Sequence, residues 1–208
     1  MHPLDCPNWE YNDHPNQPTL RQHIASVLID LRSGDLDTLG VATDTRPKHR
    51  KLFYALTPVG CDYFAGHYRG ENYRCLQFYS VGIASDPRVG VQPSAVAYHM
   101  GQLSDHIRAA LMALDANALL APKDRARLVI ALACSVFVNF LTIHPYANGN
   151  GHVGRLIIWC ILARYGLWPQ QWTVEPRPPD PPYTDMITEY RNGNPNPLEF
   201  YLLGMLSH

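Results

Sequence analysis

Apolar residues recur at helical spacing through most of the second half of the chain. One face of the segment 94–114 carries apolar residues three or four positions apart: Val96, Met100, Leu103, Ile107 and Leu111. The segment 123–143 is apolar on nearly every side, which is typical of a helix at the centre of a bundle. Further helices are expected over 151–165 and, as one helix or a pair, over 184–206. The pattern therefore predicts a helical bundle.

The first half of the chain combines one clear helix with polar and turn-rich segments. Residues 1–18 are polar and proline-rich and indicate an irregular arm, whereas 19–31 has helical spacing followed by a Ser-Gly stop. Residues 73–84, YRCLQFYSVGIA, are rich in strand formers and precede a run of turn residues, which predicts a β-hairpin. We expect this hairpin to be the only sheet in a mainly α-helical fold.

Composition and charge exclude several classes of protein. The 208 residues carry a formal net charge of -1, so the chain lacks the basic surface typical of a nucleic-acid binder. The N-terminus has no apolar signal core. The longest apolar run, 128–143, is shorter than the roughly 20 residues that a bilayer span requires. We therefore expect no nucleic acid and no membrane among the partners.

Five cysteines are scattered along the chain without a CxxC pair: Cys6, Cys61, Cys75, Cys134 and Cys160. Their odd number and wide spacing predict neither a disulfide framework nor a zinc site. Cys134 and Cys160 lie in apolar runs and are expected to be small buried hydrophobic residues. These observations favour a reducing, cytoplasmic location, with secretion as an effector as the alternative.

The densest group of chemistry-bearing residues is HPYANGNGHVGR, residues 144–155, between the two most apolar helices. Its glycines let the backbone approach a ligand closely, and free N–H groups at the start of a helix bind anions. Arg155, one turn into that helix, can fork onto phosphate oxygens. His144 lies at the rim, where an imidazole can accept a proton. An isolated Asn-Gly loop is usually only a turn, but this combination predicts a phosphate site beside a general base.

The same segment resembles the signature of the Fic domain, written HPF-x-(D/E)-GN-(G/K)-R-xx-R. The matching positions are His144, Pro145, Gly149, Asn150, Gly151 and Arg155, and Tyr146 replaces a similar aromatic. Chance agreement at six fixed positions is on the order of one in a hundred thousand. The segments 52–70, 79–96 and 183–206 also resemble the upstream segment, the flap and the closing helices of Fic domains. The resemblance implies a Fic domain over 51–208, after an N-terminal extension over 1–50 that holds one or more helices.

The resemblance also implies a role for each matching residue. His144 would deprotonate the target hydroxyl, and Arg155 would hold the terminal phosphates. The anion hole would consist of Gly149, Asn150 and Gly151. The flap backbone would align the target by strand addition through Val81, Gly82, Ile83 and Ala84. The implied reaction transfers AMP from ATP to a Ser, Thr or Tyr hydroxyl of a target protein, with Mg²⁺ as cofactor.

Two positions depart from the signature. Asn148 stands where the family has an acidic magnesium ligand, so its neutral amide oxygen would hold the metal more weakly. His152 stands where the family has its first arginine, and an imidazole lacks the bidentate fork of a guanidinium on phosphate. The alternatives are therefore transfer of another group (UMP, phosphate or a phosphoalcohol) or a non-catalytic domain that binds nucleotide or protein.

The chain carries no recognisable inhibitory helix of the family pattern (S/T)xxxE(G/N). Of its five glutamates only Glu71 is followed by Asn, and His67 stands four positions before it. Inhibition, if present, would come from a separate small antitoxin-like partner. His67 and Arg69 are expected either to line the pocket or to lie in a solvated loop. His99 and His106 are interpreted as surface residues rather than as a metal pair.

Overall fold

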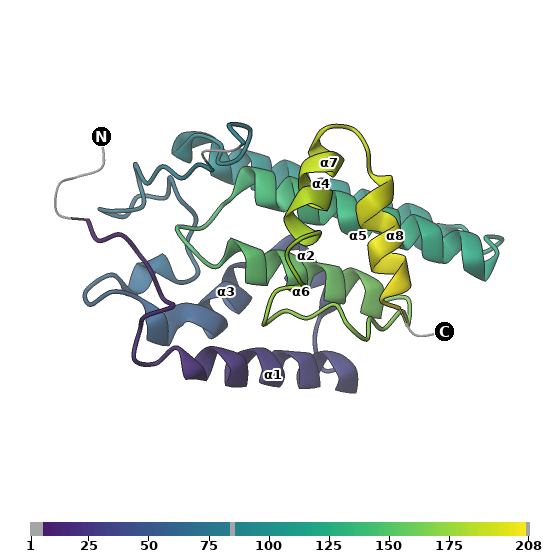
Figure 1. Ribbon diagram of the computed structural model, residues 1–208, viewed down its shortest axis with the longest axis horizontal. Coiled ribbons are helices and arrows are strands. Elements are labelled where there is room, and N and C mark those ends of the chain that lie inside the picture. The colour runs from purple at the N-terminus through teal and green to yellow at the C-terminus, as the bar shows by residue number, and fades with distance from the viewer. Residues whose placement is uncertain (1–5, 84–85, 207–208) are drawn as a thin grey trace.

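Helix α5 (Pro122–Ile143) contains the longest apolar run, and it forms the centre of the fold together with α6 (Asn150–Ala163) (Figure 1). This computed structural model describes residues 6–83 and 86–206. The other α-helices of the described residues are α1 (Pro18–Ser33), α2 (Thr38–Thr43), α3 (Arg46–Phe53), α4 (Pro93–Ala116), α7 (Tyr183–Arg191) and α8 (Asn196–Gly204). Two short 3-10 turns, η1 (Tyr54–Leu56) and η2 (Asp62–Phe64), follow α3.

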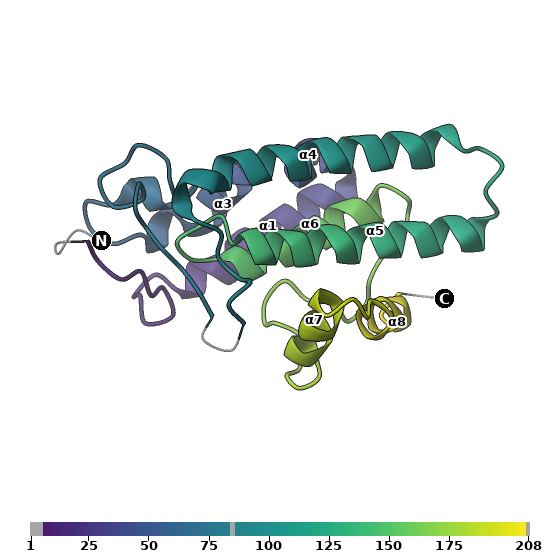
Figure 2. The ribbon, with the colours of Figure 1, turned by 90° about the horizontal axis from the view of Figure 1, so that it is seen from above.

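Other helices pack against both members of the α5–α6 pair. Helix α4 runs antiparallel beside α5, while α7 and α8 lie on the other side of α5 (Figure 2). The predicted apolar face of α4 is the one that is buried. Helices α1 and α2 contact α6. Gly154 permits the close approach of α6 to α5, because a Cβ atom there would lie 3.0 Å from the Phe137 ring.

Helix α5 is long and apolar enough, on length and composition alone, to cross a membrane, and no other helix of the described residues is. The core helix of a soluble protein passes the same test. Here α5 packs against α4, α6 and α8, and ten of its residues are buried. The prediction of a helix buried at the centre of a bundle is therefore confirmed.

The N-terminal arm, defined here as residues 6–17, precedes α1 and is anchored to the rest of the fold by several contacts, among them a hydrogen bond of Trp9 and a disulfide of Cys6. The Trp9 side chain is 2% exposed, and its indole N–H donates to the Leu56 carbonyl over 2.7 Å. Cys6 forms a disulfide with Cys75. The expectation that these two cysteines are unpaired is thus wrong, because residues 69 positions apart in the chain meet in the fold. The expected cytoplasmic location loses the support of cysteine spacing and stays a prediction.

Removal of this disulfide is expected to lower the free energy of unfolding by about 2–4 kcal/mol, because the bond closes a long loop of the unfolded chain. The measurement is urea unfolding of Cys6→Ser combined with Cys75→Ser, alongside the oxidised wild type. A reductant should bring the wild type to the midpoint of the double variant and leave the variant unchanged. Equal midpoints for oxidised and reduced wild type would contradict the prediction.

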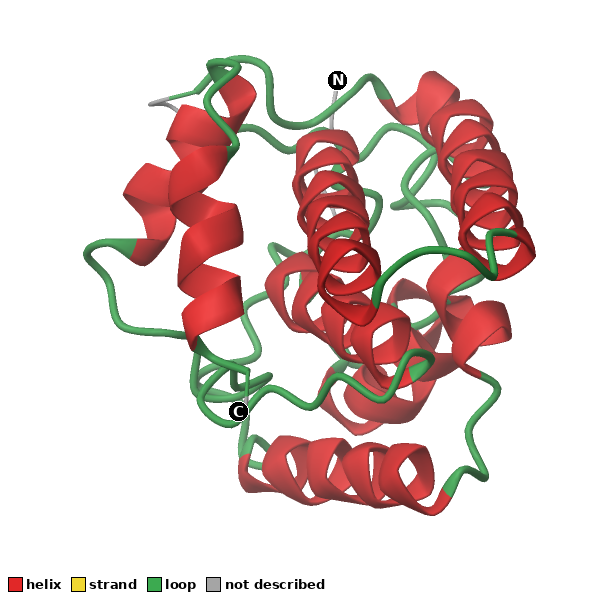
Figure 3. Ribbon diagram, turned by 90° about the vertical axis from the view of Figure 1, so that its right-hand side faces the viewer, coloured by secondary structure: helices red, strands yellow, loops and turns green. Residues whose placement is uncertain are grey.

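The hairpin predicted over residues 73–84 is not confirmed as a pair of strands. Helices and loops make up the described residues, and their β-pairing is limited to isolated bridges such as that between Ile83 and Asp86 (Figure 3). The amides of Leu76 and Gln77 both donate to the Tyr73 carbonyl, so the strand formers build consecutive turns and use their side chains for packing. Ala84, the last predicted flap residue, lies outside the described residues.

Candidate functional site

The signature segment forms a tight loop between α5 and α6. Helix α5 ends at His144, whose φ of 54° is left-handed, and α6 begins after Gly149, whose φ is 78°. The buried Asn150 side chain closes the loop, because its Oδ1 accepts from the Tyr146 amide and its Nδ2 donates to the Tyr146 carbonyl, each over 2.9 Å. The Asn150 side chain therefore shapes the predicted anion hole from within.

Gly149 is required by both backbone and space. Its positive φ disfavours other residues, and a Cβ atom would lie 2.5 Å from the Phe53 ring. No side chain caps the N-terminus of α6, so the first N–H groups of the helix are left for another acceptor. Free N–H groups together with the helix dipole favour an anion at this point.

A cavity of about 460 Å³ opens at this loop. It brings together the seven predicted residues of the signature: His144, Asn148, Gly149, Asn150, Gly151, His152 and Arg155. It also contains residues from two other segments: Tyr11, Asn12, Glu175, Pro176 and Arg177. Sequence reasoning missed these five residues, because neither the arm nor the proline-rich connector between α6 and α7 (residues 164–182) carries a motif.

The geometry of His144 suits a general base. Its Nδ1 lies 3.2 Å from the Leu141 carbonyl oxygen, which can only accept, so Nδ1 holds the proton and Nε2 has a free lone pair. Burial is the main cause that lowers the pKa of His144 to about 4; the Leu141 hydrogen bond raises this pKa, and the nearby charges of Arg69 and Arg191 lower it. The ring is therefore neutral and able to accept a proton at physiological pH.

Arg69 is neither a pocket residue nor part of a solvated loop, contrary to both expectations. Its guanidinium is 1% exposed and donates to four backbone carbonyls at 2.8–3.1 Å: those of Ile143, His144, Tyr79 and Val91. Burial lowers the pKa of Arg69 to about 10, which still leaves it charged at neutral pH. Arg69 thus joins the end of α5 to the two arms of the predicted flap and fixes the backbone that carries the base.

His49 of α3 supports the loop from below, and sequence reasoning missed it because it lies in the basic run RPKHRK, which indicates a solvated face. Its Nε2 donates to the Asn148 carbonyl over 3.0 Å, and its Nδ1 accepts from the Gly66 amide over 2.9 Å. The ring stacks on Tyr146 with centroids 3.7 Å apart. Burial lowers the pKa of His49 to about 3, so both bonds belong to the neutral ring.

The protein is expected to lose stability as the pH falls below about 6.5. Unfolded histidines take up a proton near that pH, whereas folded His49 and His144, with pKa values of about 3 and 4, do not. The free energy of unfolding should therefore fall by up to about 1.4 kcal/mol per pH unit for each histidine. Urea unfolding at pH 7.5 and pH 5 measures the slope. His49→Asn should be less stable than the wild type at pH 7.5, but its free energy of unfolding should depend less on pH. An equal free energy of unfolding of the wild type at the two pH values would refute the prediction.

Both ring nitrogens of His152 are hydrogen-bonded, so the ring has no free N–H group for a phosphate, although His152 lines the cavity. Its Nε2 lies 2.7 Å from the Glu175 carboxylate and must donate, so Nδ1 accepts from the Tyr11 hydroxyl over 3.2 Å. Burial and the charge of Arg155 lower the pKa of His152, and burial raises the pKa of Tyr11 to about 12. The His152 imidazole is therefore neutral, accepts from the Tyr11 hydroxyl and donates to the Glu175 carboxylate.

Arg155 lines the same cavity as His144, and its role as a phosphate ligand stays a prediction. Its Nε donates to the Val174 carbonyl over 2.9 Å, and its Nη1 lies 3.4 Å from the Tyr183 hydroxyl. Nη2 makes no hydrogen bond with the part of the chain that the structure describes, and the side chain lines the cavity. Arg155 is thus oriented by its inner nitrogens and keeps an outer nitrogen for an anion.

The Asn148 side chain is poorly suited to bind a metal ion, because both of its polar atoms already form hydrogen bonds. Its Oδ1 accepts from the Gly149 amide over 2.8 Å, and its Nδ2 donates to the Trp9 carbonyl over 2.6 Å. The described residues contain no group of three or more His, Cys, Asp or Glu side chains that could hold a metal. These side chains do not fit a magnesium ion held by the protein, and the expected cofactor stays a prediction that would require the ligand's own phosphates as donors.

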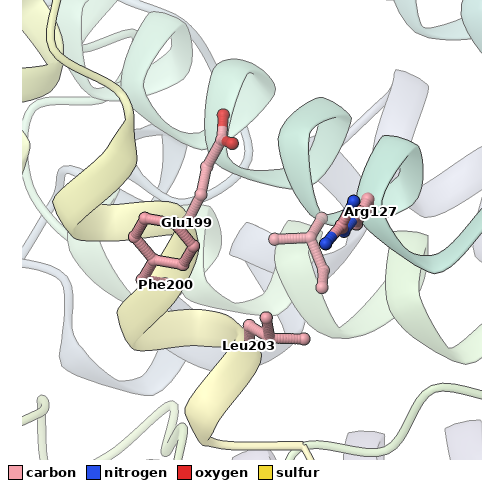
Figure 4. Close-up of a pocket in the computed structure, with 5 residues that line it drawn as sticks. Arg127, Glu199, Phe200 and Leu203 are labelled. Carbon is pink, nitrogen blue, oxygen red and sulfur yellow. The ribbon is translucent and has the colours of Figure 1, made fainter. Parts of the chain in front are cut away.

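The predicted docking residues of the flap lie outside the cavity lining. Gly82 and Ile83 are exposed, and Val81 is partly buried. Another cavity, of about 370 Å³, lies between α5 and α8, where Arg127 and Glu199 flank apolar side chains (Figure 4). It contains no residue of the signature, so the phosphate-type chemistry belongs to the cavity at His144.

Comparison with known proteins agrees with the geometry of the loop. The model described as "Fic/DOC family" matches residues 44–162, which is more than half of the chain and includes the whole signature loop. No curated protein sequence matches the chain.

Proposed function

The chain belongs to the Fic/DOC family, a family of group-transfer domains, and on this premise we propose that it is a protein nucleotidyltransferase. The proposed reaction moves AMP from ATP to a Ser, Thr or Tyr hydroxyl of a target protein. The observation that carries the proposal is the shared cavity, which places the neutral His144 beside the open N-terminus of α6 and Arg155.

The proposed mechanism uses positioning and charge stabilisation. The N–H groups of Asn150 and Gly151 at the uncapped start of α6 and the outer nitrogen of Arg155 bind the phosphates, whereas the Gly149 amide already donates to Oδ1 of Asn148. The target hydroxyl donates its proton to Nε2 of His144 while its oxygen attacks the α-phosphorus. The bond between the α-phosphorus and the bridging oxygen breaks, and pyrophosphate leaves with the negative charge that the N–H groups and Arg155 stabilise.

The test is intact-mass and peptide mass spectrometry after incubation with magnesium, a cell lysate as source of targets, and one donor at a time. The donors are the four nucleoside triphosphates and a nucleoside diphosphate ester of a phosphoalcohol. An AMP-sized adduct on a hydroxyl side chain is the expected result. Nucleotide binding without an adduct from any donor would exclude transfer and leave the non-catalytic binding domain.

A different transferred group is the second candidate, and the contacts of Asn148 and His152 favour it. Neither residue presents the charge that the family signature has at its position: Asn148 is held by Gly149 and the Trp9 carbonyl, and His152 by Tyr11 and Glu175. An adduct of UMP, phosphate or a phosphoalcohol in the same experiment would select this alternative. The target protein and a separate inhibitory partner are proposed from the family alone.

A further inference from the structure

The two positions that depart from the signature are the two that the N-terminal arm holds. The Trp9 carbonyl accepts from Nδ2 of Asn148 over 2.6 Å, and the Tyr11 hydroxyl donates to Nδ1 of His152 over 3.2 Å. An acid at position 148 has no N–H group to donate to that carbonyl. An arginine at position 152 could donate to the Tyr11 oxygen but could not accept from its hydroxyl, as neutral His152 does. The departures from the signature and the contacts of the arm are therefore complementary.

Aromatic packing holds the arm in this position. Between its two contacts with the loop, the Trp9 ring packs among His49, Phe53 and Phe64 at centroid distances of 5.7–6.0 Å. Tyr11 packs on Phe53 at 5.1 Å and is 8% exposed. Asn12, next to it, also lines the cavity. The arm is therefore a wall of the cavity, to which it contributes Tyr11 and Asn12, while the buried Trp9 anchors it beside the cavity.

Both ends of the arm are fixed to other parts of the fold. The C-terminal end leads into α1, where Asn16 donates from its side chain to the Ala55 carbonyl over 3.1 Å. The N-terminal end is fixed by the Cys6–Cys75 disulfide. Cys75 precedes Leu76, and the Leu76 carbonyl accepts from the amide of Gly70 over 2.8 Å. Gly70 directly follows Arg69 in the chain. The disulfide thus attaches the arm to the loop that also holds the backbone of His144.

We propose that the N-terminal arm is a working part of the ligand site and that the Cys6–Cys75 disulfide keeps it there. Trp9 and Tyr11 are positioning residues: they orient Asn148 and fix the tautomer of His152. Reduction by a dithiol breaks the S–S bond, forms two thiols with two electrons and two protons, and converts the reductant to its own disulfide. The freed arm then exchanges between bound and open positions. The effect on ligand binding rests on the proposed function, whereas the release of the arm does not.

The first experiment measures hydrogen–deuterium exchange over residues 6–17 and 144–152. The samples are the oxidised protein, the reduced protein, and Asn148→Asp. Asn12→Asp is the matched control, because it adds the same charge to the same cavity wall at a side chain that makes no hydrogen bond with the described residues. Exchange at both segments should rise at least tenfold on reduction and in Asn148→Asp, and less than twofold in Asn12→Asp. Unchanged exchange of the arm in the reduced protein and in Asn148→Asp would overturn the proposal.

The second experiment asks whether the arm serves the ligand. Calorimetry with ATP should show at least fivefold weaker binding for the reduced protein than for the oxidised one. In Tyr11→Phe, which keeps the ring, ¹⁵N NMR should show a shifted Nδ1 signal for His152, which a merely structural role of the ring would not produce. Equal ATP affinity with a released arm would overturn the proposal. If no nucleotide binds the oxidised protein, the proposed function fails, and the exchange of residues 144–152 alone decides whether arm and loop are coupled.

Discussion

Replacing His144 with alanine is expected to lower the rate of transfer by about 10³-fold, because general base catalysis contributes 10²–10⁴-fold and this site contains one neutral imidazole with a free Nε2 at the loop. The affinity for nucleotide should change less than about threefold, because the proposed phosphate ligands are the N–H groups of α6 and Arg155. The measurement is the initial rate of adduct formation by mass spectrometry, with nucleotide affinity determined separately.

The control is His106→Ala, which removes an exposed histidine of α4 and should leave the rate unchanged. The pH dependence gives an independent check on the base. Because the pKa of His144 is lowered to about 4, protonation of the base should not slow the reaction until the pH approaches that value. If His144→Ala kept more than one tenth of the wild-type rate, another group would have to accept the proton.

Replacing Arg69 with alanine is expected to lower the free energy of unfolding by about 4 kcal/mol or more. The substitution leaves four buried carbonyl oxygens without their donor, and each unsatisfied buried group costs about 1–3 kcal/mol unless water reaches it. Lysine keeps the charge but not the planar fork that reaches carbonyls of three segments, so Arg69→Lys should recover only part of the loss. Thermal unfolding should show a decrease of about 10 °C or more for the alanine variant.

Arg108→Ala is the matched control for this change. Arg108 is an exposed arginine of α4 whose partners are Ser104 and Asp105 of the same helix, and its loss should cost less than about 0.5 kcal/mol. A Tm for Arg69→Ala within 2–3 °C of the wild type would mean that water replaces the guanidinium without penalty.

The sequence predicted the parts of the fold in which local pattern and burial coincide. The segments expected as helices at 94–114, 123–143 and 151–165 correspond closely to α4, α5 and α6, since each has an apolar face or an apolar circumference that is buried in the fold. The short helices α2 and α3 were missed, because TLGVAT and RPKHRKLF are too short or too polar to show helical periodicity.

The candidate site likewise has one part that could be predicted from the sequence and one part that could not. The loop of residues 144–155 could be predicted, because its residues are contiguous and their order carries the chemistry. Tyr11, His49, Arg69 and Glu175 could not be predicted in their places, because they come from segments that meet the loop only in the folded chain. The pairing of Cys6 with Cys75 depends on the same long-range contact. Residues 73–84 show the opposite error, since strand-forming side chains there are used to pack a turn-rich loop.

The boundaries of the family match cut through this site. Residues 44–162 contain the loop and Arg155, but Trp9 and Tyr11 lie before the match and Glu175 lies after it. A fragment trimmed to the matched segment would lose α1 from the side of α6, uncover Phe53 beside Gly149, and leave His152 without either partner. Truncation at the family borders should therefore produce an aggregation-prone fragment, and an assay on such a fragment would report on an incomplete pocket. The smallest unit suitable for study includes both the arm and the proline-rich connector.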